Sequence, residues 1–147
     1  MKNELTALKG LRDTIEAHIN EYVPPELEDI GPGQVVIDYP DVDKMTYPTM
    51  FFVYPDYAEY EPSTTCSDNV DFRISVFLLC KRDTQENLII KNYGYYNALY
   101  HLLKDNTSLD GVIDQTRIND ADFDQVEGNP NVHGALVSVS TIFEKDF

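Results

Sequence analysis

Apolar residues recur at spacings of three and four near the start of the chain. They are Leu5, Leu8, Leu11, Ile15, Ile19 and Tyr22, and the polar residues Lys2, Lys9, Asp13, Glu16 and Asn20 fall on the other side. Side chains three and four positions apart share one side of an α-helix, so this spacing predicts an amphipathic helix over residues 4–22. Pro24 and Pro25 end that helix, because proline has no amide hydrogen to donate.

The pattern changes between residues 24 and 62, where seven of the eight prolines lie. Prolines at this density exclude long regular elements, so we expect short strands joined by turns. Apolar runs at residues 34–38 and 50–54 are the two short strands that the pattern favours. Aromatic residues alternate with acids and prolines through residues 39–60.

Apolar and polar residues alternate from Val70 to Ser75, and this pattern predicts a long strand over Val70–Lys81. One side carries Val70, Phe72, Ile74, Val76, Leu78 and Cys80, and the other side begins with Asp71, Arg73 and Ser75. Phe77 and Leu79 then make the second half apolar on both sides. We expect that half to lie under a helix or against another subunit.

A second helix is predicted over residues 84–105. Asp83 and Glu86 have the spacing of a capping box at its start. Its apolar stripe comprises Leu88, Ile89, Tyr93, Tyr96, Tyr100 and Leu103. Tyr95, Leu99 and Leu102 widen the stripe, so the helix is expected to contact more than one surface.

Two more strands are predicted near residues 113–123 and 132–144, joined by a turn at residues 127–130. The order α-β-β-α-β-β indicates an α+β fold, with a mostly antiparallel sheet of about four to five strands flanked by helices. No linker divides the chain, so residues 1–147 are expected to form a single domain. The expected core includes Leu8, Ile15, Ile74, Val76, Leu99, Leu103, Val137 and Val139.

The net charge of the chain limits the kinds of molecule that it is expected to bind. With 26 acidic and 11 basic residues, the formal net charge is -15, which repels nucleic-acid phosphates. Such acidity suits solubility, attraction of basic partners, or the lining of a passage for a polyanion. The first residues do not resemble a signal peptide, and the longest apolar run, Val76–Cys80, is too short to cross a membrane. Cys66 and Cys80 are expected to be reduced thiols.

No pattern in the sequence indicates catalysis. His18, His101 and His133 lack a neighbouring nucleophile or metal-ligand motif, and the seven glycines are scattered instead of forming a phosphate loop. We therefore expect no enzyme activity and no cofactor.

Asp120, Asp122 and Asp124 are the weak candidates for a metal site. In an extended chain their carboxylates project from one face, and clustered oxygen ligands suit calcium or magnesium. A calcium loop of the EF-hand kind would need glycine and glutamate where Gln125 and Asn131 stand. The sequence favours a solvated strand face.

Several aromatic and apolar residues are candidates for contacts with other subunits or with a tube of another protein. Tyr54, Tyr57 and Tyr60 either cover the sheet or form such a contact, because tyrosines are enriched at interfaces. The remaining candidates are Phe77, Leu79, Tyr95 and Tyr96.

The chain resembles the tail terminator, or tail completion, proteins of tailed bacteriophages and prophages. The resemblance rests on the order of elements over nearly the whole chain: a first helix, a proline-rich segment ending in the strand at residues 48–54, and the long strand Val70–Lys81. A helix with residues 95–103 (YYNALYHLL), the short passage 108–112 (SLDGV) and two final strands complete it. The helix followed by the Leu109-Asp110-Gly111-Val112 passage is the most family-like part.

That resemblance implies a structural virion protein of the tail or neck, assembled in the bacterial host cytoplasm. It implies a homo-oligomeric ring, commonly of six subunits, that caps the tail tube, stops its polymerisation and meets the head connector. DNA would pass through the acidic bore without specific binding. The alternatives are a head-closure neck protein, an acidic DNA-mimic inhibitor of a nucleic-acid-binding protein, and a calcium-dependent binding module.

Overall fold

The computed structural model describes residues 1–125 and 131–146, with two α-helices and a five-stranded sheet. The elements are α1 (Glu4–His18), the 3-10 turn η1 (Ile19–Glu21), β1 (Val35–Ile37), the 3-10 turn η2 (Val42–Lys44), β2 (Thr49–Thr64), β3 (Ser67–Lys81), α2 (Gln85–Asp105), β4 (Gln115–Gln125) and β5 (Val132–Asp146). The strand order is β1-β2-β3-β5-β4, and all neighbours are antiparallel except β1 and β2. This confirms the α+β class, with one strand more than the expected order.

The first helix begins where its capping residues dictate. Asn3 accepts a hydrogen bond from the amide of Thr6 at 2.8 Å, and the Thr6 hydroxyl accepts one from the amide of Asn3 at 2.9 Å. These bonds satisfy amides that a helix start leaves without partners. Leu5 is exposed and Leu8 only half-buried, so the buried side of α1 begins at Ala7 and Leu11.

Gly10 is required by a close approach between α1 and the chain after α2. A Cβ at this position would lie 3.0 Å from a methyl carbon of Val112. The side of α1 at Gly10 therefore packs directly against the 108–112 turn.

The prolines do not keep β2 short, which corrects the expectation for residues 24–62. The strand passes through Pro55 and Pro62, with register shifts directly after each. β1 pairs with β2 only at residues 51–53, so the outer side of β2 beyond that point is a free edge. Proline has no amide hydrogen to donate to a neighbouring strand. On the free edge no strand would accept that hydrogen bond, so Pro55 and Pro62 are tolerated there.

The start of α2 also differs from the prediction. The N-cap is Thr84, whose hydroxyl accepts from the amide of Asn87 at 3.3 Å. Asp83 lies one residue earlier and binds Lys91 Nζ at 2.6 Å. Hydrogen bonds from Lys91, Asn87 and the Thr84 amide lower the pKa of Asp83 to about 2.

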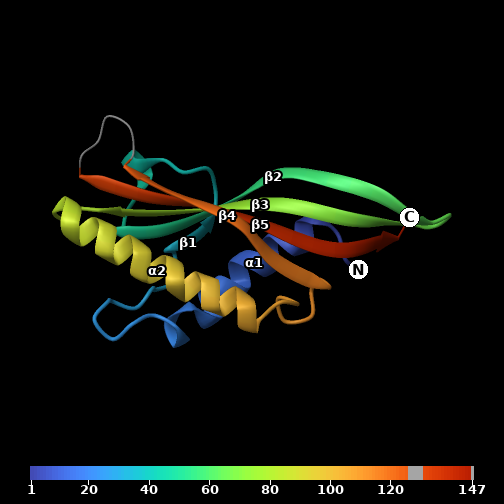
Figure 1. Cartoon of the computed structure of the whole chain (residues 1–147), viewed down its shortest axis with the longest axis horizontal. Coiled ribbons are helices and arrows are strands. Elements are labelled where there is room, and N and C mark those ends of the chain that lie inside the picture. The colour runs from blue at the N-terminus through green and yellow to red at the C-terminus, as the bar shows by residue number, and fades with distance from the viewer. Residues whose placement is uncertain (126–130, 147) are drawn as a thin grey trace.

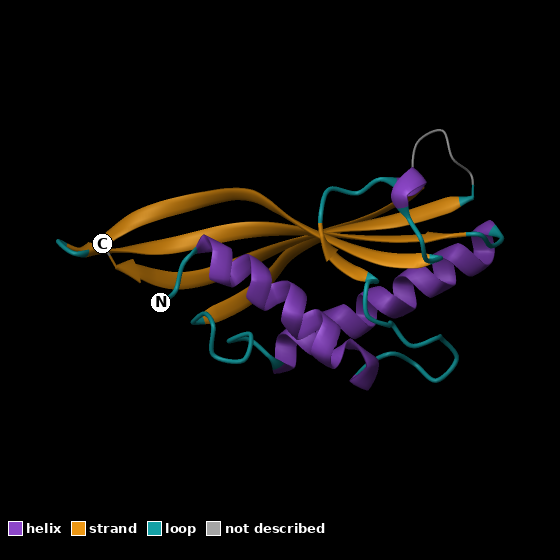
Figure 2. Cartoon of the chain, turned by 180° about the vertical axis from the view of Figure 1, so that it is seen from behind, coloured by secondary structure: helices purple, strands orange, loops and turns teal. Residues whose placement is uncertain are grey.

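Both α-helices pack on the same face of the sheet, in one hydrophobic core (Figures 1 and 2). The inward side of β3, from Val70 to Cys80 at every second residue, is buried there with Val137 and Val139 of β5. The predicted facing of both strands is confirmed. Of the expected core residues, Leu8 alone is only partly buried.

The opposite face is covered at one end only. There Met45, Met50, Phe52, Leu79 and Val132 form a second buried cluster, with Val36, Val42 and Phe77 packed against it. Lys81 Nζ donates to the carbonyls of Val42 and Met45 at 3.3 and 3.0 Å, which holds η2 over the sheet. Beyond this cluster the same face carries Asp71, Arg73 and Ser75.

Candidate interaction surfaces

Leu79 and Tyr95 lie inside the subunit, which corrects their assignment as interface candidates. Leu79 is 1% exposed, in the second cluster under the chain's own η2 segment. Tyr95 is 3% exposed, and its hydroxyl donates to the Glu28 carbonyl at 2.7 Å. Burial raises the pKa of Tyr95 to about 12. Side chains already buried by their own chain add no area to a contact.

Phe77 is partly covered by the same cluster. It lies over Gly134 of the neighbouring strand, where a Cβ would be 2.6 Å from a ring carbon. The apolar end of β3 is therefore covered by α2 on one face and by residues 42–50 on the other. No second subunit is needed to explain its composition.

The three tyrosines of β2 do not share one face of the sheet. Tyr54 pairs with Ser75 and Tyr57 with Arg73, so both lie on the face away from the helices. Residues three apart normally face opposite ways, but the register shift between Pro55 and Tyr57 adds one residue. Tyr60 pairs with Val70 and lies on the helix-covered face.

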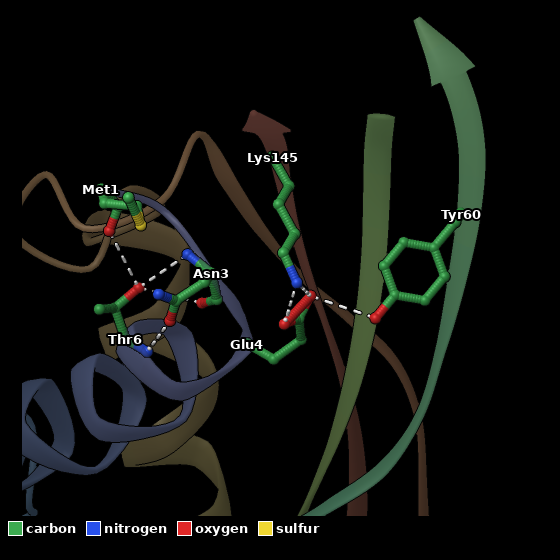
Figure 3. Close-up of polar contacts among 6 residues, drawn as sticks. All are labelled: Met1, Asn3, Glu4, Thr6, Tyr60 and Lys145. Carbon is green, nitrogen blue, oxygen red and sulfur yellow. Dashed lines mark hydrogen bonds and ion pairs between the residues drawn. The ribbon is translucent and has the colours of Figure 1, made fainter. Parts of the chain in front are cut away.

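Tyr60 takes part in a polar cluster that ties α1 to the sheet (Figure 3). Its hydroxyl donates to Glu4 Oε1 at 3.1 Å, and Lys145 Nζ donates to both Glu4 carboxylate oxygens at 2.9 and 2.8 Å. Partial burial of the Glu4 carboxyl raises its pKa, but the hydrogen bonds, led by that from Lys145, outweigh this and leave the pKa lowered.

An aromatic surface does form where Tyr39 meets β2. Its ring packs on Tyr54 with centroids 5.2 Å apart, and the Arg73 guanidinium lies 5.2 Å from the centre of the Tyr57 ring. Tyr39 is 64% exposed and Tyr57 43% exposed. We call Tyr39, Tyr54 and Tyr57 the β2 tyrosine surface.

The largest aromatic cluster lies on the outer side of α2, where β4 meets it. Phe123 of β4 contacts Tyr96 edge-on with centroids 4.8 Å apart, and lies 5.8 Å from Tyr93. Tyr100 continues the row at 6.4 Å from Tyr96. Together with Ile89 these residues form what we call the α2 aromatic surface: Ile89, Tyr93, Tyr96, Tyr100 and Phe123. Burial by neighbouring side chains raises the pKa of Tyr96.

Of these five residues, only Tyr96 is an interface candidate from the sequence alone. The apolar stripe that the sequence predicts for this helix contains Ile89, Tyr93, Tyr96 and Tyr100, whereas the buried side of α2 comprises Leu88, Asn92, Tyr95, Ala98, Leu99, Leu102 and Leu103. The sequence pattern does not reveal this buried side, because Asn92 is polar and is nevertheless 0% exposed. It donates to the carbonyl of Leu78 at 3.1 Å, across the helix–sheet contact.

Asp120 and Asp122 of β4 lie on the face away from α2. Asp120 and Asp122 pair with Ser138 and Leu136, and both are exposed. The side chain of Asp124 lies outside the described residues. Among the residues that are described, no group of three or more acidic, histidine or cysteine side chains is placed to hold a metal ion. Two aspartates alone do not supply the six to eight oxygens that calcium takes.

The histidines are separated in the fold. His18 is near Glu21 and Asp110, at 3.1 and 3.4 Å, while His101 lies in α2 and His133 in β5. Within the described part of the chain, no helix is long and apolar enough to cross a membrane. No protein-family model matches the sequence, and comparison with curated proteins finds no match either.

Proposed function

We propose that this chain is a structural subunit that works by assembling, as a ring-forming tail or neck protein like the phage tail terminators. The observation that carries the proposal is the α2 aromatic surface, with Tyr93 56% and Ile89 49% exposed. Exposed aromatic groups of this kind mark protein–protein contacts more often than single apolar residues do.

The remaining features fit an assembly part. The described histidines lie apart, and the described acidic and cysteine residues form no metal site. The ring would cap a tail tube, join it to a head connector and pass DNA through an acidic bore, as the family resemblance implies. A net charge of -15 on each subunit would keep that DNA from adhering.

The experiment is a measurement of particle mass by light scattering across a salt series. Subunits of charge -15 repel one another, and the Debye length shortens from about 30 Å at 0.01 M salt to about 10 Å at 0.1 M. We expect single subunits in low salt and a ring, visible by electron microscopy, as salt or magnesium rises. A mass that stays at one subunit at every salt and protein concentration would contradict the proposal.

The second candidate function is an acidic DNA mimic that inhibits a nucleic-acid-binding protein. The free edge of β2 favours it, because Asp56, Glu59 and Glu61 follow one another there and all are exposed. Such a protein would remain a monomer or dimer in the salt series and bind a basic partner. The mass measurement separates the two candidates.

A further inference from the structure

The exposed apolar side chains fall into two regions toward opposite edges of the sheet. In the described part of the chain, the large apolar residues that are most exposed, apart from Met1 and Leu5 near the N-terminus, gather around β1–β2 and around α2–β4. The first region has Tyr39, Tyr47, Tyr57 and Tyr60, and the second has Ile89, Ile90, Tyr93 and Phe123.

These regions face in different directions. The strand order β1-β2-β3-β5-β4 places β2, with its free outer half, toward one edge and β4 at the other edge. The β2 tyrosine surface lies on the face away from the helices, whereas Phe123 and α2 lie on the helix-covered face. One two-fold contact between copies therefore cannot contain both surfaces.

The two regions also differ in charge. Residues 87–104 of α2 contain no aspartate or glutamate, and Lys91 and Lys104 are their only charged residues. Residues 38–61 contain Lys44 and six acids: Asp38, Asp41, Asp43, Asp56, Glu59 and Glu61. Arg73 of β3, over the Tyr57 ring, is a basic residue within the β2 tyrosine surface. Lys104 Nζ lies 5.4 Å from the centre of the Tyr100 ring, at the end of the α2 aromatic surface. Asp120 and Asp122 of β4 lie on the other face of the sheet.

We infer that the α2 aromatic surface of one copy docks on the β2 tyrosine surface of the next copy. Aromatic rings on both sides supply the apolar area, and the acid-free stretch 87–104 of α2, with Lys104 at its end, meets the acid-rich segment 38–61, so the charges are complementary. Because each copy uses two different surfaces, the contact is heterologous, and it closes into a ring or grows into a filament according to its rotation. This inference rests on the proposed function, since it names the contact that builds the assembly.

The experiment uses two variants that each damage one surface. Tyr93→Asp places a carboxylate on the α2 aromatic surface, and Tyr57→Asp places one on the β2 tyrosine surface. Each variant alone is expected to lose assembly and to run at the mass of one subunit, 16.8 kDa. An equimolar mixture is expected to form a pair of twice that mass, since the intact β2 surface of the first variant still accepts the intact α2 surface of the second.

Leu5→Asp is the matched control, because Leu5 is 57% exposed and lies outside both surfaces. It is expected to assemble as the wild type does. Circular dichroism and thermal unfolding check that every variant is folded. If either aspartate variant is unfolded, Ile89→Asp and Tyr39→Asp repeat the experiment at residues that are 49% and 64% exposed.

Several results would overturn the inference while leaving an assembling subunit in place. Assembly of the Tyr57→Asp variant alone would show that α2 surfaces contact each other, and assembly of Tyr93→Asp alone would show the same for β2. Failure of the mixture to form pairs would exclude the head-to-tail contact. A wild-type chain that stays monomeric throughout would overturn both the contact and the proposed function. Filaments in place of rings would support the contact and contradict the capping role.

Discussion

The two ends of the sheet share the same strands but are covered differently. At the end where β3 meets α2, both faces are buried, by α2 on one side and by residues 42–50 on the other. At the end with the β2–β3 hairpin (Figure 1), β2 and β3 extend away from α2. There the helix-side residues Val70, Phe72 and Phe143 are buried, while Asp71 and Arg73 on the other face are partly exposed. The first end is therefore buried on both faces. The second end leaves the face opposite the helices and the edge of β2 available for contacts.

The largest loss of stability is expected when a charge is placed between the helices and the sheet. Val137 is 0% exposed in the main core, so Val137→Asp buries a carboxylate without a partner. We expect a loss of several kcal/mol, enough to abolish soluble expression. Ser138→Asn is the matched control, since the next residue of β5 lies on the opposite, half-exposed face. Soluble, folded Val137→Asp protein would refute the facing of β5.

A smaller loss of stability is expected on the sheet face opposite the helices, and it should differ between the covered part and the open part of that face. Leu79→Ala leaves a cavity in the second cluster and is expected to lower the free energy of unfolding by about 2–5 kcal/mol. Arg73→Ala, on the same strand and face but beyond the cluster, removes the contact with the Tyr57 ring and should cost about 0.5–1 kcal/mol. Urea unfolding measures both. Equal losses would show that residues 42–50 do not protect this end.

The smallest effect concerns the link between α1 and the open end of the sheet. The pKa of Glu4 is lowered by Lys145 and Tyr60 in the folded chain, despite the opposing effect of burial. A lowered carboxyl pKa stabilises the fold above the ordinary value of 4.5, and this contribution disappears as the pH falls through the folded pKa. Glu4→Gln should therefore lower the Tm at neutral pH by at most about 2–4 °C.

The pH series supplies the control for this last effect. The difference in Tm between the wild type and Glu4→Gln should shrink as the pH falls below 4.5, since protonated Glu4 also lacks its charge. A difference that stays constant down to low pH would show that the ion pair with Lys145 contributes nothing. Leu5→Gln, at the neighbouring exposed position, should show no such pH dependence.

The sequence alone determined the α+β class, the position of both helices and the facing of β3 and β5. These depend on local periodicity, with spacings of three and four in α1 and the alternation of apolar and polar residues that begins β3 at Val70–Ser75. The tertiary structure decided what covers each element. It extended β2 through Pro55 and Pro62, because β1 leaves that edge unpaired, and it brought Tyr54 and Tyr57 to one face through a single-residue register shift. It also turned Tyr93 and Tyr100 outward and buried Asn92, because α2 is apolar on most sides and only its contact with the sheet selects the side that is buried.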